Sequence, residues 1–144
     1  MAKVFVALTF IVIAIGALSD GALADTAPAA TEAGARRSAG TTAGIVQGRT
    51  LFNRNCQMCH NQRGVGGKCP TLVRGAWAPG GPNRASFMIT TITDGRPGTE
   101  MPSWAKVLNP QQIRRIVAYL RHESHVIAAQ DGKRARRRHY ERRR

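Results

Sequence analysis

The feature that most constrains this chain is the pentapeptide CQMCH at residues 56–60. Its two cysteines, Cys56 and Cys59, stand three positions apart, and His60 follows the second one directly. On a helix, residues three apart lie on the same side, so both thiols can reach one ligand. The spacing therefore predicts a site at which two sulfur atoms and an imidazole act together.

Three uses of a Cys-x-x-Cys pair have to be compared. A structural zinc site needs four ligands, and only Cys69 remains, with no paired Cys or His at suitable spacing. A thioredoxin-type redox pair expects a βαβ setting, which the sequence does not predict. In covalent haem attachment, Cys56 and Cys59 add to the two vinyl groups of one haem, and His60 turns onto its iron. We favour haem attachment, with the zinc and dithiol sites as alternatives.

Residues 1–24 have the pattern of a secretory signal peptide. Lys3 precedes an apolar run of 15 residues at 4–18, and the small-residue pattern Ala22-Leu23-Ala24 ends the segment. The run is shorter than the roughly 17–25 residues that span a bilayer. We expect cleavage after Ala24 and export to the periplasm; the alternative is an uncleaved segment that tethers the protein to the membrane. Three cysteines, an odd number, argue against a plain disulfide framework in an oxidising compartment.

The pattern of apolar residues predicts an all-α fold, with no competing strand pattern. Residues 25–43 are rich in Ala, Thr, Gly and Ser and are expected to form a flexible linker. Helices are predicted at 45–55 and 85–93, separated by a Gly- and Pro-rich loop at 61–83 that is long enough to wrap around something. The last helix is expected to start at the N-cap Asn109, with a capping-box pattern and apolar residues at helical spacing behind it.

The chain is strongly basic, and its positive charge is unevenly distributed. The formal net charge is +14, and the domain expected at residues 44–128 holds eleven Lys and Arg against three Asp and Glu. Residues 129–144 hold eight Lys and Arg against two acidic residues, and we expect this basic tail to be disordered because its like charges repel. Such a surface favours acidic-surfaced periplasmic redox proteins or an anionic membrane as partners. Nucleic acid is not an expected partner of an exported protein.

Several motifs are spread over the part of the chain from about residue 44 to residue 128. They are Gly48, Phe52, CQMCH at 56–60, Pro70-Thr71-Leu72, GRPGTEMPSW at 95–104, and Tyr119. On these residues the chain resembles a class I c-type cytochrome. The attachment motif alone is shared by any c-type haem protein, and the downstream Met-Pro in a Gly-rich loop makes the resemblance specific to this family. The resemblance implies that the first and last helices of the domain cross closely where Gly48 meets Tyr119.

The same resemblance implies a small cytochrome c fold, with three or more helices wrapped around one covalently attached haem c. It implies that Met101 is the second axial ligand of the iron, opposite His60, and a soft thioether in a loop between two helices agrees with this role. The Pro70 carbonyl is expected to accept the other ring N–H of His60. Trp77 and Trp104 are expected to wall the haem, with an indole N–H near a propionate.

Two positions leave alternatives open. A second histidine, from His122, His125 or His139, could take the place of Met101 on the iron. Cys69 stands where a glycine commonly precedes the proline in this family. It is interpreted either as a small buried apolar residue or as an exposed thiol able to link two chains or a partner.

Ligation by His60 and Met101 fills both axial positions of the iron and leaves little room for oxygen or substrate. The sequence therefore predicts a periplasmic monohaem electron carrier, rather than an enzyme. It would transfer one electron at a time between a dehydrogenase or respiratory complex and a terminal acceptor. The alternatives are a haem subunit of a larger oxidoreductase, and a haem enzyme or sensor with an open iron position.

Overall fold

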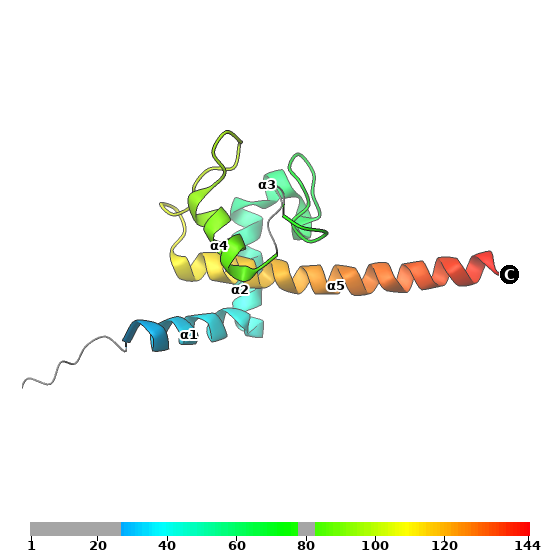
Figure 1. The fold of residues 1–144 in the computed structure, drawn as a ribbon, viewed down its shortest axis with the longest axis horizontal. Helices are drawn as coiled ribbons and strands as arrows, with labels where there is room; N and C mark the ends of the chain where they lie inside the picture. Colours follow the sequence, from blue (N-terminus) through cyan, green and yellow to red (C-terminus); the bar gives the residue numbers. More distant parts are fainter. Residues whose placement is uncertain (1–26, 78–82) are drawn as a thin grey trace, which may run out of the picture.

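The protein is built from helices that pack around one long C-terminal helix. The computed structural model describes residues 27–77 and 83–144, and these two ranges contain no β-strand (Figure 1). The all-α prediction is confirmed, whereas the predicted signal peptide at 1–24 lies outside the described residues. The elements are α1 (Ala27–Gly40), α2 (Thr42–Asn55), α3 (Gln57–His60), the short 3-10 helix η1 (Gln62–Gly64), α4 (Ala85–Asp94) and α5 (Pro110–Arg142).

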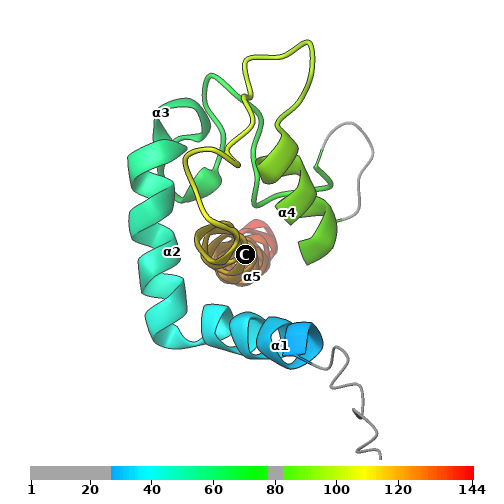
Figure 2. The same ribbon diagram turned by 90° about the vertical axis from the view of Figure 1, so that its left-hand side faces the viewer.

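Helix α5 forms the axis of the fold. Seen along this axis, α2 and α4 lie on opposite sides of α5, α1 lies on a third side, and loops lie on the fourth (Figure 2). The helix begins as the sequence predicts, because the Gln112 N–H donates to Asn109 Oδ1 at 2.9 Å and the Asn109 N–H donates to Gln112 Oε1 at 2.8 Å. This reciprocal capping satisfies two backbone donors and fixes where α5 starts.

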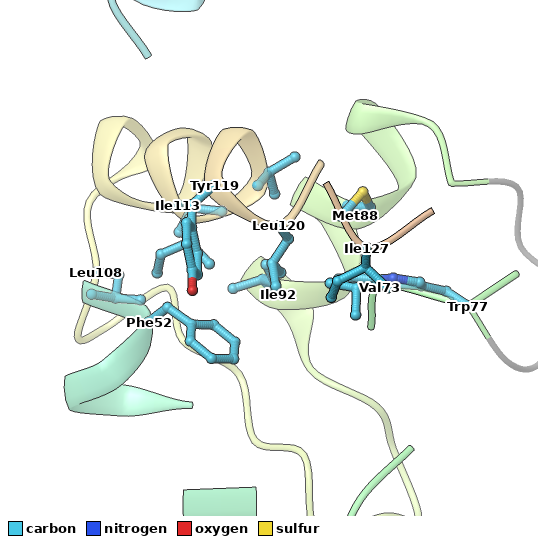
Figure 3. Packing of buried hydrophobic residues seen from close by; sticks show 12 residues of the cluster. Phe52, Val73, Trp77, Met88, Ile92, Leu108, Ile113, Tyr119, Leu120 and Ile127 are labelled. Atoms are coloured by element: carbon cyan, nitrogen blue, oxygen red, sulfur yellow. The ribbon is translucent and has the colours of Figure 1, made fainter. Parts of the chain in front are cut away.

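The apolar faces of α2, α4 and α5 meet in one core (Figure 3). Phe52 of α2 and Tyr119 of α5 pack with their ring centroids 5.6 Å apart at a tilt of 51°. Phe52 also lines the cavity described below, together with the core residues Ile92, Ile116 and Leu120. The packing of the helices therefore positions the wall of the site.

Helices α2 and α5 cross closely at Gly48. A Cβ atom at this position would overlap the backbone carbonyl of Arg115 and would lie 3.0 Å from the Cβ of Tyr119. Glycine is therefore required here for steric reasons. This is the crossing that the resemblance implied, and it fixes the distance between α5 and the helix that leads into the CQMCH segment.

The structure corrects the expectation of a flexible linker at residues 25–43, because α1 covers most of this segment. Polar contacts hold α1 against the start of α5. Gln111 Nε2 donates to Ser38 Oγ at 2.7 Å, and Arg114 Nη1 lies 3.3 Å from Glu32 Oε1. The linker prediction missed this helix because it considered only large apolar side chains. Alanine is the best helix former, and polar contacts to α5 need no large apolar residue.

The structure also corrects the expectation of a disordered tail at residues 129–144, because α5 continues through almost all of it. This part of the helix projects beyond the rest of the domain (Figure 1). Both of its acidic residues are paired: Arg74 Nε lies 2.9 Å from Asp131 Oδ2, and Arg137 Nε lies 2.8 Å from Glu141 Oε1. The prediction considered charge repulsion alone. Alanine, arginine and lysine are all good helix formers, and the charged ends of the arginine and lysine side chains stay in water.

Candidate functional site

A cavity of about 350 Å³ lies between α3 and the loops that follow α3 and α4. Its size is within the range of small-molecule and cofactor sites. The seven residues that the sequence singled out for a haem site come from four separate segments of the chain, and all of them line this one cavity. They are Cys56, Cys59, His60, Pro70, Trp77, Met101 and Trp104.

His60 ends helix α3 and is buried, with 9% of its surface exposed. Its Nδ1 lies 3.0 Å from the carbonyl oxygen of Pro70, as the sequence analysis expected. A carbonyl can only accept a hydrogen bond, so Nδ1 carries the proton and Nε2 keeps its lone pair. The contact thus orients the ring and leaves Nε2 available to a metal.

The two motif cysteines lie at the junction of α2 and α3. Cys56 ends α2, since its N–H donates to the Phe52 carbonyl at 2.8 Å, and it opens the next turn by accepting from the His60 N–H at 3.0 Å. Burial, and to a lesser degree the neighbouring Cys59, raises the pKa of Cys56 to about 12. The Cys56 side chain is therefore a neutral thiol within an apolar wall.

The loop that carries Met101 is fixed by its own backbone. Gly95 ends α4 with φ 74°, and a Cβ there would collide with the backbone of Pro102 and Ser103. Within the loop, the Arg96 N–H donates to the Met101 carbonyl at 2.9 Å, and the Met101 N–H donates to Thr99 Oγ1 at 3.2 Å. Met101 is half-buried, packs against the core and lines the cavity.

The two tryptophans differ in what their indole N–H groups can do. Trp77 is buried, and its Nε1 already donates to the Leu72 carbonyl at 2.9 Å. The Nε1 of Trp104 is buried and has no partner among the described protein atoms. A buried polar group without a partner is costly, so an acceptor on a bound molecule would satisfy it. Trp104 is thus the tryptophan whose N–H fits the predicted contact with a propionate.

Two basic residues that the sequence analysis did not single out also line the cavity. They are Arg96, directly after the glycine that ends α4, and Lys68, directly before Cys69. Lys68 Nζ lies 3.0 Å from Glu100 Oε2, so this ion pair joins the two loops that border the cavity. Lys68 stands two positions before Pro70, and Arg96 lies in the string 95–104 that holds Met101. These positions were the available signal, because a haem carries two carboxylates that basic side chains can neutralise.

Residues 43–120 match the family model described as "Cytochrome C oxidase, cbb3-type, subunit III", which is more than half of the chain. The chain belongs to this family of c-type cytochromes. A relative named "Cytochrome c55X" from Stutzerimonas stutzeri is 45% identical over 67 residues, which cover 46% of this chain and 57% of that protein.

The "Cbb3-type cytochrome c oxidase subunit CcoP" of Azospirillum brasilense is 33% identical over 85 residues, covering 54% of this cytochrome but only 28% of CcoP. This cytochrome therefore spans between about a quarter and three fifths of these two curated relatives. Cytochrome CL from Methylophaga aminisulfidivorans has a similar structure, with a TM-score of 0.55 and 22% identity over 72% of this chain and 71% of that chain. That likeness supports the fold and nothing further.

Membership of the family makes covalently bound haem c the cofactor of this cytochrome and electron transfer its general role. The residues at the cavity fit that cofactor. Two adjacent thiols, an imidazole with a free Nε2 and a thioether border one apolar space, and an unpaired indole N–H points to a polar group of the bound molecule. Most of the cavity wall is apolar, which suits the porphyrin plane, and the basic side chains Lys68 and Arg96 stand at its border.

Proposed function

We propose that this cytochrome is a periplasmic one-electron carrier, in which Cys56 and Cys59 bind a single haem covalently while His60 and Met101 ligate its iron. The observation that carries the proposal is the convergence of the seven singled-out residues on one apolar cavity. When bound, haem c supplies a metal centre that accepts and gives up one electron at a time. The bond from His60 to Pro70 at 3.0 Å supports the assignment of His60, because it leaves only Nε2 free.

The protein residues hold and enclose the cofactor. Two thioethers would prevent its loss, the loop of Met101 would close the face opposite His60, and Phe52 and Leu120 would keep water from the porphyrin. With both axial positions occupied, no site remains for a substrate on the iron, so the protein is proposed to be a carrier and not an enzyme.

The proposed location is the periplasm, after cleavage behind Ala24. Haem attachment outside the cytoplasm agrees with the signal-peptide pattern at residues 1–24. A protein tethered to the membrane by an uncleaved N-terminal segment is the alternative. In the two described ranges, no helix combines the length and the apolar character that crossing a bilayer requires.

A second candidate is a haem subunit of a larger oxidoreductase. It is favoured by the family model, whose description is an oxidase subunit, and by the likeness to CcoP. In that case a respiratory oxidase would be the partner. A stable complex would copurify with other subunits in fixed proportion, whereas a diffusible carrier would be isolated alone.

The proposed function is tested on the protein purified from the periplasm. We expect the pigment to stay on the denatured chain in acidified organic solvent, because thioethers are covalent. We also expect a low-spin ferric spectrum with a methionine-sulfur band, and no rapid binding of carbon monoxide to the reduced form. Pigment that passes into the solvent would contradict attachment at Cys56 and Cys59. Rapid carbon monoxide binding would instead favour a haem enzyme or sensor.

Proposed partners are redox proteins with acidic surfaces, and removal of the basic end of α5 tests this. Deleting residues 133–144 removes eight Lys and Arg and one Glu, all of them exposed. We expect the association rate with an acidic flavoprotein donor to fall about tenfold or more at low salt, with a shallower salt dependence. Stopped-flow kinetics across ionic strength measures both quantities.

The matched control for this deletion changes Arg136, Arg137 and Arg138 to lysine, which keeps the charge. Its salt dependence should equal that of the unmodified protein. Changing the same three residues to glutamine should make the salt dependence of the association rate shallower, toward that of the deletion variant. An unchanged salt dependence in the deletion would contradict steering by α5, and a loss of binding only to anionic vesicles would favour the membrane as partner.

A further inference from the structure

The projecting part of α5 carries three arginines on one side. The buried residues of this helix recur at helical spacing as far as Ile127. At steps of three or four positions, the same side of the helix continues through Asp131 and then through Arg134, Arg138 and Arg142. All three arginines are exposed, and we call them the arginine row. The side of α5 that is buried within the domain thus becomes the arginine row where the helix leaves the domain.

The arginine row lies on the side of α5 from which the domain rises. Seen along α5, the loops that border the cavity lie on one side of the helix, and α1 lies on the opposite side (Figure 2). In the other view the loops rise from α5, and the helix runs out beyond them (Figure 1). The pair of Arg74 and Asp131, 2.9 Å apart, joins the loop after α3 to α5 just before the row begins. The row therefore lies on the inside of a corner between the projecting helix and these loops.

The arginine row has no acidic partner within the described ranges. The two acidic residues of this part of α5 are paired elsewhere, Asp131 with Arg74 and Glu141 with Arg137. No other ion pair of the described residues includes a member of the row. Like charges four positions apart repel one another and destabilise an isolated helix. Carboxylates placed along the row would replace this repulsion by attraction.

The spacing of the row suits an acidic protein surface. Its members follow one another at about 6 Å along the helix axis, because a helix rises about 1.5 Å per residue. Arginine binds a carboxylate through two parallel hydrogen bonds, which fixes the geometry of the pair as well as supplying charge. Three exposed guanidinium groups in line can therefore bind a line of Asp and Glu side chains on a partner.

We propose that an acidic redox protein docks in this corner, with its carboxylates on the arginine row and its surface against the loops that border the cavity. The inference rests on the proposed function, because an electron carrier has to bring its partner close to the haem site. A convex protein surface can enter a corner. A flat bilayer lying along the row would meet the domain that rises on the same side of α5 (Figure 1). The corner therefore favours a protein over an anionic membrane as the partner.

Two charge-matched variants of the full haem-loaded chain test the docking face. The first changes all three arginines of the row to glutamine. The second changes Lys133, Arg136 and Arg137 to glutamine; these exposed residues lie on the opposite side of the same stretch of α5. With the acidic flavoprotein donor, we expect the association rate at low salt to fall about tenfold in the first variant and about twofold or less in the second. Equal losses would mean that α5 attracts its partner without a docking face, and would overturn the proposal.

A third variant locates the contact directly. It changes the arginine row to lysine, which keeps the charge and gives each position an amine that a carbodiimide can join to a carboxylate of the flavoprotein donor. Lys133, on the opposite side of α5, is the internal control. Digestion and mass spectrometry of the joined proteins should find donor peptides at positions 134, 138 or 142 and few at Lys133. Joining chiefly at Lys133 would overturn the proposal.

The outcomes separate this inference from the proposed function. If deletion of residues 133–144 leaves the association rate unchanged, the proposed class of partner fails, and the docking face fails with it. If the deletion slows association but the two glutamine variants are slowed alike, only the docking face fails. If the first glutamine variant keeps its association rate and loses only its binding to vesicles that contain phosphatidylserine, the row binds membrane and the proposal is overturned.

Discussion

The Met101→Ala variant is expected to keep its haem and to lose the sixth ligand of the iron. The substitution leaves the backbone bonds of Met101 to Arg96 and Thr99 in place and removes only the thioether. We expect the methionine-sulfur band to disappear, the ferric form to become high-spin, and the reduced form to bind carbon monoxide rapidly. The reduction potential should fall by on the order of 100 mV, since axial ligands set haem potentials over roughly 0.8 V. Absorption spectra and a redox titration measure these changes.

Met58→Ala is the matched control for this experiment. Met58 lies between the two motif cysteines, so it is close to the attachment site in sequence. The residue is 93% exposed and is therefore directed into solvent. Its spectrum should equal that of the unmodified protein. A methionine-sulfur band that survives in Met101→Ala would show that a different residue ligates the iron. A low-spin spectrum without that band in the unmodified protein would favour a second histidine instead.

The helices of the domain could be predicted because their signals are local. The cap of α5 needs only Asn109 and the residue three positions later, and α4 ends at Gly95, whose positive φ of 74° is one that glycine adopts readily. Apolar residues at helical spacing then identify the faces that form the core. Signals of this kind depend only on residues within about one helical turn, so they can be read without knowing the rest of the fold.

Helix α1 and the extension of α5 could not be predicted in the same way. The bond from Gln111 to Ser38 joins residues 73 positions apart, and the bond from Arg74 to Asp131 joins residues 57 positions apart. Contacts between such distant residues exist only once α5 is in place. Composition alone therefore favoured disorder in both segments, although alanine and arginine are strong helix formers.

In the site, too, some features could be predicted from local sequence and others depend on contacts between distant residues. A short motif and a family resemblance named its residues, but their contacts depend on the folded loops. Trp77 and Trp104 are equivalent in sequence terms, and they differ only because the Leu72 carbonyl reaches the indole of Trp77. The position of Cys69 beside Cys59 likewise depends on how the chain turns back along α3.

Gly48→Ala is expected to produce the largest loss of stability among single-methyl additions to the helices. The added Cβ would overlap the carbonyl of Arg115, which is backbone of α5 and cannot rotate away. Helices α2 and α5 would have to move apart, and because α2 leads into the attachment motif, the cavity would widen with them. We expect the free energy of unfolding to fall by about 1–3 kcal/mol. The melting temperature, followed by circular dichroism of the haem-loaded protein, should fall by roughly 4 °C for each kcal/mol.

Gly132→Ala provides the same change of residue inside a helix where space is available. The nearest atom to its added Cβ is the end of the flexible Arg136 side chain, at 3.8 Å. Alanine is favoured over glycine in a helix by about 1 kcal/mol, so this variant should melt at the same temperature or slightly higher. Opposite effects of one methyl group at these two positions would isolate the crossing of α2 and α5 as the cause. A Gly48→Ala protein as stable as Gly132→Ala would mean that the two helices do not approach each other as closely as Gly48 requires.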